Sequence, residues 1–493
     1  MGLLKSNTLQ PTKENLLKTL QEDLFGRNED LFYFVSLLNQ LEDNCVIGLD
    51  GQWGSGKTFF VKHAKMILDA CNQTETIYNE EEVTQIQSAM ATASNGKFDV
   101  QNSQWQVSVY YDAWLNDETV SPILSLIYTI LETIPTDYPF KDSETPTIEQ
   151  IAEISEFLVQ HFAPDEIKNP ASKIIDLAGK LLSGGTKEDI ISPIRKQKAF
   201  EEKVSEFLNL LMEERGNRLV IFIDELDRCK PSYSVQLLEQ IKHYFSNERV
   251  TFVFSVNSEQ LQHTIKQVYG ADFDAIRYLD RFFDYRLPLP PANVERYCSQ
   301  SLPRNRFDEA ALFCLCYRTI IRQYNFSIRE IERFTNASKV AVYSEVSKSN
   351  PYKTRYGKAK WLLESTMVPL LIALSMTNSK AYMDFINGRG EKLFVDLLNN
   401  SEAYRFIGYT FLDINELQKQ NTALKRLEDK ELMAPYEDKL REVYQSVWRF
   451  PLSQNYEREV SVGEYTFTPE TKSELLKTIS LLSSNANYVV DEQ

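Results

Sequence analysis

The sequence contains few of the residues that build metal centres and disulfide frameworks. Four histidines occur among 493 residues, and the six cysteines include no Cys-x-x-Cys pair of the kind that zinc and redox sites use. No histidine stands with cysteines or carboxylates at the spacing of a metal site. We therefore expect reduced thiols, without a zinc module.

Long hydrophobic runs and an excess of basic charge are also missing. The first 20 residues are polar and charged throughout, which argues against a signal peptide. The longest apolar stretch, Trp361–Met376, contains Glu364 and Pro369 and falls short of the roughly 20 residues that a membrane span needs. The 54 basic side chains stand against 70 acidic ones, and this net charge of −16 disfavours a general nucleic-acid surface. We expect a cytosolic protein without a membrane span.

The most informative stretch that is present is Gly51–Thr58, with the sequence Gly-Gln-Trp-Gly-Ser-Gly-Lys-Thr. Its spacing is that of a phosphate-binding loop (Walker A), in which backbone N–H groups at a helix N-terminus surround the phosphates of a nucleotide. The apolar run Cys45–Leu49 precedes it, and apolar residues at helical spacing follow over Phe59–Ala70. Strand, loop and helix in this order are the context that the motif requires.

The residue types of the loop each have a physical reason. Gly51, Gly54 and Gly56 let the backbone close around phosphate oxygens, with φ values that a Cβ would disfavour. Lys57 is predicted to reach the β- and γ-phosphates, and Thr58 to place its hydroxyl on Mg²⁺. The other loop residues assigned to nucleotide binding are Gln52, Trp53, Ser55 and Phe59.

A second part of the site is predicted after another apolar run. Arg218–Asp224 is rich in β-branched and aromatic residues and ends in acid, the pattern of a buried parallel strand. Asp224 is predicted to support Mg²⁺ together with Thr58, and Glu225 is the candidate general base that activates water. The residues Asp227-Arg228 follow, either as a structural ion pair or as part of the site.

Two further strands are predicted for the same sheet. Trp105–Tyr111 alternates apolar and polar residues, and Val250–Val256 is a continuous apolar run after an expected helix over Ser232–Phe245. Asn257 follows the second run, at the position where a parallel sheet has its phosphate crevice. It is predicted to hold the attacking water or the γ-phosphate as a sensor, or else to be a turn-forming residue.

Four blocks of this sequence together resemble one family, the KAP family of P-loop NTPases. The phosphate loop carries Trp53 in the form Gly-x-Trp-Gly-Ser-Gly-Lys-Thr, and Tyr111–Trp114 is similar to the family's aromatic strand end. Ile223–Cys229 resembles its Walker B block. Tyr278–Phe283, which leads to Leu287–Pro290, resembles its fifth strand.

The resemblance extends over about residues 20–335 and implies an α/β fold. The implied core is a parallel P-loop sheet of the additional-strand (ASCE) class, in three αβα layers with helical insertions, related to the STAND and AAA+ groups. It implies ATP and Mg²⁺ as cofactors, ATP hydrolysis as the activity, and a helical lid after the core. Many members insert transmembrane helices between the Walker blocks, but residues 134–212 contain no adequate apolar span here.

The resemblance also suggests functional residues outside the Walker blocks. Phe25–Arg27 is similar to the segment that closes over adenine, which assigns Gly26 and Arg27 to nucleotide binding, although a helix-breaking turn explains the same residues. Arg281 lies where a finger that reaches a neighbour's phosphate would be, and Arg329 resembles a lid arginine that senses the γ-phosphate. For both arginines, pairing with nearby surface acids is the alternative.

The predicted organisation has four parts. They are an N-terminal helical segment with two helices (1–44), the core (45–295) with insertions at 72–104 and 135–212, the helical lid (296–345) and a mainly α-helical C-terminal domain (346–493). The last part has Trp361–Ile386 as its apolar centre and ends in the strand-like Val460–Phe467 and a short helix. We expect protein partners, or a second copy of the chain, to bind through it.

The leading functional hypothesis is an ATP-hydrolysing switch that couples nucleotide state to assembly or to a partner. The family resemblance suggests bacterial anti-phage defence as its setting. A nucleic-acid-dependent motor or translocase is the main alternative, which the net charge of −16 disfavours. A small-molecule kinase and a binding module with an inactive site are weaker hypotheses, because Asp224 and Glu225 suit the activation of water.

Overall fold

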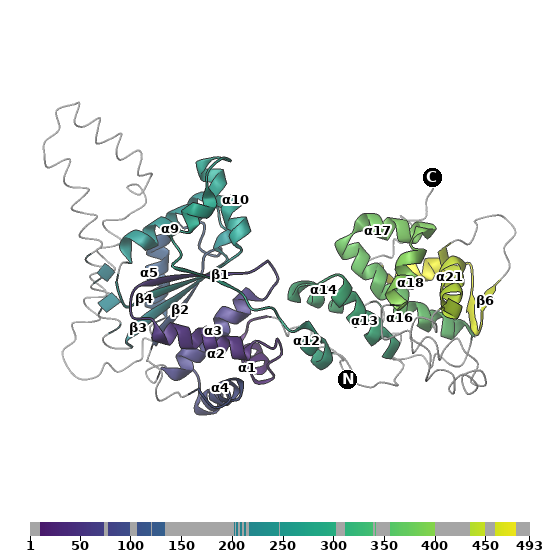
Figure 1. Cartoon of the computed structure of the whole chain (residues 1–493), viewed down its shortest axis with the longest axis horizontal. Helices are drawn as coiled ribbons and strands as arrows, with labels where there is room; N and C mark the ends of the chain where they lie inside the picture. The colour runs from purple at the N-terminus through teal and green to yellow at the C-terminus, as the bar shows by residue number, and fades with distance from the viewer. Residues whose placement is uncertain are drawn as a thin grey trace. The chain divides into compact units, whose positions relative to one another are not determined.

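The protein consists of two compact units, one formed by Leu9–Ala292 and the other mainly by Asn293–Gln493. The computed structural model (Figure 1) describes residues 10–72, 77–98, 106–119, 121–133, 216–245, 247–301, 311–338, 355–399, 434–448 and 459–479, with Ala341 and a few positions between 202 and 212. Within the insertion at 135–212 the sequence predicts helices at 149–163, 170–182 and about 194–212; the first two, and most of the third, lie outside the described residues.

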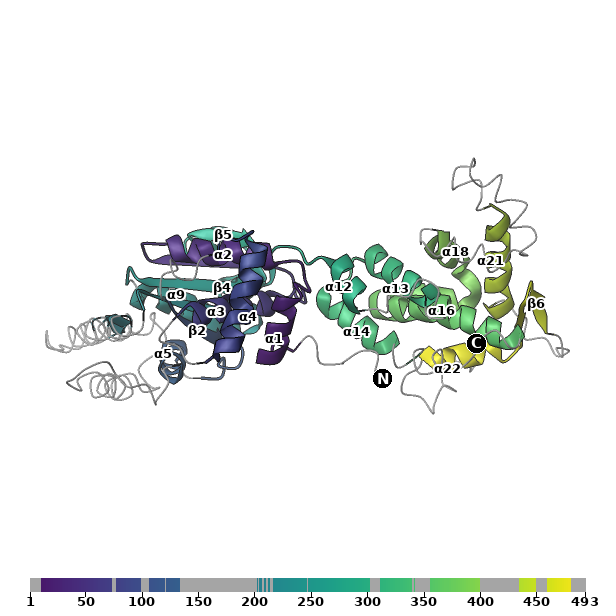
Figure 2. The same cartoon turned by 90° about the horizontal axis from the view of Figure 1, so that it is seen from below.

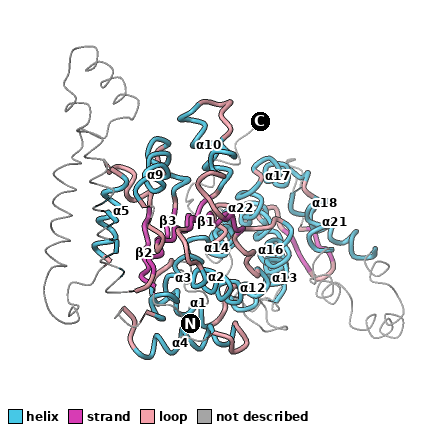
Figure 3. Tube along the Cα trace, turned by 60° about the vertical axis from the view of Figure 1, so that its left-hand side comes forward, coloured by secondary structure: helices cyan, strands magenta, loops and turns pink. Residues whose placement is uncertain are grey.

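The first unit is built on a five-stranded parallel sheet with the order β2-β3-β4-β1-β5. Figure 3 draws its strands in magenta and labels β1, β2 and β3. Its strands are β1 (Cys45–Asp50), β2 (Gln106–Asp112), β3 (Arg218–Asp224), β4 (Val250–Val256) and β5 (Tyr285–Pro288). The strands β3 and β4 have the predicted bounds, and both are buried along their whole length, as their unbroken apolar sequences require. Because β4 lies between β1 and β3, the sheet has the strand order of the additional-strand P-loop class.

Helices cover both faces of this sheet and complete the three layers (Figures 1 and 2). One face carries α1 (Lys13–Gln21), α2 (Asn28–Gln40), α3 (Lys57–Cys71) and α4 (Glu80–Ala93), and the other carries α5 (Pro122–Glu132), α9 (Pro231–Tyr244) and α10 (Ser258–Tyr269). The predicted turn near Phe25–Arg27 does separate α1 from α2, and the 72–104 insertion contains the helix that the sequence predicted.

The family-like block near the fifth strand has a different structure from the one expected. Tyr278 and Leu279 belong to a short helix, α11 (Ala275–Leu279), and β5 begins only at Tyr285. The turn between them places the Phe283 ring against β1, where a Cβ on Gly48 would come within 3.2 Å of it. Phe283 therefore packs on the face of the sheet, where its ring also lies 5.6 Å from that of Phe254 on β4, and the block leads into β5 instead of forming it.

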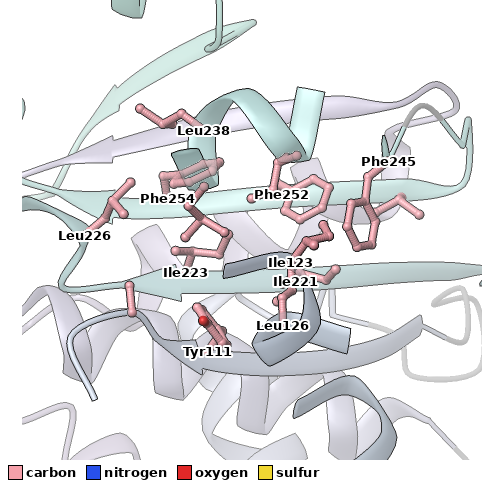
Figure 4. Close-up of a cluster of buried hydrophobic side chains, with 14 of the residues drawn as sticks. Tyr111, Ile123, Leu126, Ile221, Ile223, Leu226, Leu238, Phe245, Phe252 and Phe254 are labelled. Carbon is pink, nitrogen blue, oxygen red and sulfur yellow. The ribbon is translucent and has the colours of Figure 1, made fainter. Parts of the chain in front are cut away.

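The main hydrophobic core lies between the sheet and the layer of α5 and α9 (Figure 4). Phe252, on the central strand, packs edge-on against Phe245 with 5.3 Å between the ring centres. Tyr111 is also fully buried, and its hydroxyl shares a hydrogen bond with that of Tyr233 on α9. This core joins β2, β3 and β4 to the helices and so holds the strand ends that form the site.

The second unit is mainly helical. Its elements are α12 (Val294–Ser301), α13 (Ala311–Gln323), α14 (Ile328–Ser338), α16 (Arg355–Thr377), α17 (Ser379–Asp384), a π-helical turn (Phe385–Arg389), α18 (Glu391–Asn399), α21 (Ala434–Trp448), the hairpin β6–β7 (Val460–Val462 and Tyr465–Phe467) and α22 (Thr471–Ile479). The hairpin and final helix match the strand-like stretch and short helix expected from the sequence.

Within the described residues, α16 is the helix that is long and apolar enough to cross a membrane, over Tyr356–Thr377. The helix is longer than the apolar stretch Trp361–Met376, because it begins at Arg355 and continues through Pro369 to Thr377. Its apolar character has another explanation in the structure, since 83% of its most apolar window is buried inside the protein. It is packed as a core helix of the second unit, against α13, β7 and α22.

The core packing predicts a large loss of stability for Phe252→Ala. The side chain is fully buried, and such a truncation in a core typically costs about 3–5 kcal/mol through lost burial and the cavity that remains. Chemical denaturation followed by circular dichroism measures the change. The matched control is Leu115→Ala, at a position 78% exposed, where the expected change is within about 0.5 kcal/mol. Equal effects at the two positions would contradict the packing described above.

Candidate functional site

The phosphate loop connects the end of β1 to the start of α3. Gly54 and Gly56 have φ values of 80° and 91°, a region that side chains with a Cβ rarely adopt, and Gly56 caps the helix. Gly51 needs to be glycine for a different reason from the one predicted. A Cβ there would come within 3.0 Å of Ser55 Oγ and 3.1 Å of Leu289 Cβ, so space and not conformation excludes larger residues.

Lys57 is the first residue of α3, and its side chain turns back into the loop. Its Nζ donates hydrogen bonds to the carbonyl oxygens of Gly51 at 2.6 Å and Gln52 at 3.3 Å. Burial lowers the pKa of the ammonium, and the nearby Asp227 and Asp224 act in the opposite direction. A buried cation that is bound to neutral carbonyls is suited to exchange them for an anion at a helix N-terminus.

The two residues predicted to hold Mg²⁺ lie against each other. Thr58 Oγ1 donates a hydrogen bond to Asp224 Oδ2 at 2.7 Å, although 166 positions separate them in the chain. A hydroxyl and a carboxylate are the hard oxygen ligands that Mg²⁺ takes, usually one or two from the protein with water and phosphate oxygens around them. No larger cluster of His, Cys, Asp and Glu suited to a metal occurs among the described residues. The donor set therefore fits Mg²⁺ bound together with a nucleotide.

Tyr110 is a site residue that the sequence analysis missed. Its hydroxyl donates to the same Asp224 Oδ2 at 3.0 Å, and Lys62 Nζ lies 4.3 Å from the centre of its ring. Burial raises the pKa of the Tyr110 hydroxyl, and the Asp224 charge raises it further, so it remains a hydrogen-bond donor. Strand alternation provided a signal, because Tyr111 faces the core and its neighbour must face the other side of the sheet.

Glu225 has an uncommon backbone conformation directly after β3. Its φ of 61° and ψ of 21° place it in the left-handed region, where a residue with a side chain is often held for a functional reason. Its Oε2 forms an ion pair with Arg228 Nε at 2.6 Å. Burial raises the pKa of the Glu225 carboxyl to about 7, Asp224 adds to this effect, and Arg228 opposes it. Such a group is suited to proton transfer near neutral pH.

Asp227 and Arg228 contact site residues and not each other. Trp53 Nε1 donates a hydrogen bond to Asp227 Oδ2 at 2.5 Å. The guanidinium of Arg228 lies 5.9 Å from the ring centres of both Trp53 and Trp114. The sequence left open a structural ion pair or a part of the site, and the contacts include both: Arg228 forms an ion pair with Glu225, and Asp227 accepts a hydrogen bond from Trp53 of the phosphate loop.

The segment predicted to close over adenine is anchored to the same loop. Arg27 is buried, and its Nη2 donates a hydrogen bond to the Ser55 carbonyl at 3.0 Å. Burial lowers the pKa of this guanidinium to about 10. Phe25 packs edge-on against Phe59 at 5.6 Å, and Gly26, which follows Phe25 in the chain, has a φ of 64° that turns the backbone. The segment is thus both a turn and a neighbour of the phosphate loop.

The three remaining predicted site residues, Asn257, Arg281 and Arg329, lie in different parts of the structure. Asn257 follows β4 at the loop's edge of the sheet, and its Oδ1 caps α10 by accepting from Gln260 N at 3.3 Å. Arg281 is exposed and borders a cavity of 280 Å³ with Asn44 and Val46, at the amino end of β1, so it is not brought to its own phosphate loop. Arg329 is exposed on α14, in the second unit.

Comparison with known sequences agrees with this architecture. Residues 32–343 match the sequence profile of the KAP family P-loop domain, which is more than half of the 493 residues. A stretch of 57 residues is 39% identical to an uncharacterized protein of Methanocaldococcus jannaschii, covering 10% of this chain and 29% of that protein. The profile match, the parallel sheet and the loop at its carboxyl edge lead to one conclusion: the chain belongs to the KAP family of P-loop NTPases.

Proposed function

We propose that this protein binds ATP with Mg²⁺ at the Gly51–Thr58 loop and hydrolyses it. The observation that carries the proposal is the 2.7 Å hydrogen bond between Thr58 and Asp224, which joins the phosphate loop to the acidic end of β3. Lys57 lies within the loop and Glu225 follows Asp224 directly, so a phosphate-binding cation and a base adjoin the pair. This set of groups is what hydrolysis of a phosphoanhydride requires.

In the proposed reaction, the loop N–H groups and Lys57 bind the phosphates, and Lys57 exchanges its two carbonyl partners for phosphate oxygens. Thr58 and Asp224 would hold Mg²⁺, which offsets charge on the β- and γ-phosphates when bound. Glu225 orients the attacking water and accepts its proton. Asn257 is proposed to contact that water or the γ-phosphate through its amide NH₂, since its Oδ1 caps α10.

The same proposal places the adenine ring of the nucleotide beside Gly26 and Arg27. In that segment the ring of Phe25 packs against that of Phe59. Arg27 donates a hydrogen bond to the Ser55 carbonyl of the phosphate loop. Arg281 is proposed to act on the nucleotide of a second copy, because it is exposed and lies at the opposite end of β1 from its own loop. Arg329 is proposed as the residue through which the lid senses the γ-phosphate.

The biological role that we propose is a nucleotide-dependent switch or assembly factor. The second unit, organised around the buried α16, supplies the surface for protein partners or for a second copy. The burial of α16 supports a role without membrane insertion, in the cytoplasm. Bacterial anti-phage defence is the setting that the family resemblance suggests, and the net charge of −16 supports it over a nucleic-acid translocase.

Substitution of the predicted base should separate binding from hydrolysis. Glu225→Gln keeps the size of the side chain but cannot accept a proton, so we expect kcat to fall by about 10²–10⁴ while nucleotide stays bound. Lys57→Ala should abolish both binding and turnover. Phosphate release and retention of radiolabelled ATP on a filter measure the two quantities. Glu259→Gln, an exposed position on α10, is the matched control; turnover by Lys57→Ala at the wild-type rate would exclude this site.

The contact of Tyr110 with Asp224 predicts a role in Mg²⁺ binding. Tyr110→Phe removes one donor to the metal-facing carboxylate, and losses of this kind typically weaken metal binding by about 10- to 100-fold. Calorimetric titration of the protein with an ATP analogue at several Mg²⁺ concentrations reports the change. Tyr111→Phe is the control on the neighbouring residue, because it removes a hydroxyl that points to Tyr233 in the core. A Mg²⁺ dependence that shifts equally in both variants would contradict the assignment.

The proposed setting predicts protection against phage that depends on the phosphate loop. Cells that express the wild-type chain should plate a susceptible phage at least about tenfold less efficiently than cells that express Lys57→Ala at equal protein level. In a parallel assay, DNA and RNA should leave ATP turnover unchanged. Stimulation of turnover by either nucleic acid, weakening as salt rises, would favour the translocase instead.

A further inference from the structure

Two tryptophans lie at the surface beside the candidate base. Trp53 is 46% exposed and Trp114 is 52% exposed, although tryptophan normally buries most of its large apolar surface. They come from the phosphate loop and from the turn after β2, and Arg228, from the turn after β3, lies 5.9 Å from the centres of both rings. Three segments that are distant in the sequence thus meet at one guanidinium.

The geometry gives this guanidinium a defined position. Its plane can stack on indole rings in a way that a lysine ammonium cannot. Its Nε binds Glu225 Oε2 at 2.6 Å, so this contact holds one of the two carboxylate oxygens. The backbone of Glu225 is already fixed in the left-handed region. Arg228 therefore controls the remaining freedom of the Glu225 side chain.

The same group of residues is connected to the phosphate loop. Trp53 is a loop residue, and its indole N–H donates to Asp227, the neighbour of Arg228. If the loop shifts when it binds phosphate, Trp53, one of the two indole rings near Arg228, would move with it. The position of Glu225 would follow, because its Oε2 is bound to that arginine.

We propose that Arg228, which lies near both Trp53 and Trp114, is a positioning residue that sets the Glu225 carboxylate for water activation and couples its position to the phosphate loop. The proposal rests on the ATPase function proposed above. Arg228 acts through Glu225, and Trp114 acts only through Arg228. Positioning of this kind matters because a displacement of about 1 Å at a reacting group can cost ~10²-fold in rate.

The test is a double-mutant cycle on ATP hydrolysis by the full-length chain. Arg228→Ala should lower kcat by about 10- to 100-fold, while KM and the affinity for a slowly hydrolysed ATP analogue stay within about threefold. Arg228→Lys should restore only part of kcat, since it keeps the charge but not the stacked plane. Trp114→Leu should lower kcat by a smaller factor, about three- to tenfold, and should add nothing to Arg228→Ala in the double variant.

Two further measurements separate positioning from a structural role. Lys230→Ala removes a nearby exposed cation and should leave kcat unchanged, and thermal melting checks that each variant is folded. Binding of the analogue should change tryptophan fluorescence in the wild type, and this change should shrink in Trp114→Phe. A wild-type kcat in Arg228→Ala, or additive losses in the double variant, would overturn the proposal. A wild-type chain that does not hydrolyse ATP would instead reject the proposed function itself.

Discussion

The parallel pairing of β1 and β3 with the central strand β4 is the constraint on which the site depends. Asp50 lies opposite Val256, and Asp224 lies opposite Ser255, so the ends of all three strands are level at one edge of the sheet. Strands buried on both faces hold their register strongly, because slipping by one residue would reverse every side chain. The phosphate loop and the Asp224-Glu225 pair are adjacent for this reason.

The charges gathered at this edge are arranged so that each group has a partner within the protein. Thr58 and Tyr110 both donate to Asp224, and Arg228 pairs with Glu225. Burial raises the pKa of Glu225 and lowers that of Lys57, so the surroundings disfavour the charged form of both the base and the phosphate-binding cation. An anionic group at the phosphate loop would favour the charged form of Lys57, whereas Glu225 already has Arg228 as its partner.

The family relationship accounts for only part of the chain. The profile match ends at residue 343, before α16 begins, whereas the second unit continues through α22. The core of that unit forms around α16, whose apolar length serves packing within the protein. An NTPase core of a shared type is thus joined to a helical unit with its own core.

The sequence by itself determined the strands β1 to β4, the phosphate loop and the identity of the Mg²⁺-binding candidates, because local periodicity and the spacing of glycine, lysine and acid leave few alternatives. Only the tertiary structure decided which side chains meet. Tyr110 joins Asp224 and Arg228 joins Glu225 and two tryptophans, whereas Arg281 lies at the other end of β1. Such contacts depend on which strands and turns lie side by side, and the spacing of residues along the chain does not specify this.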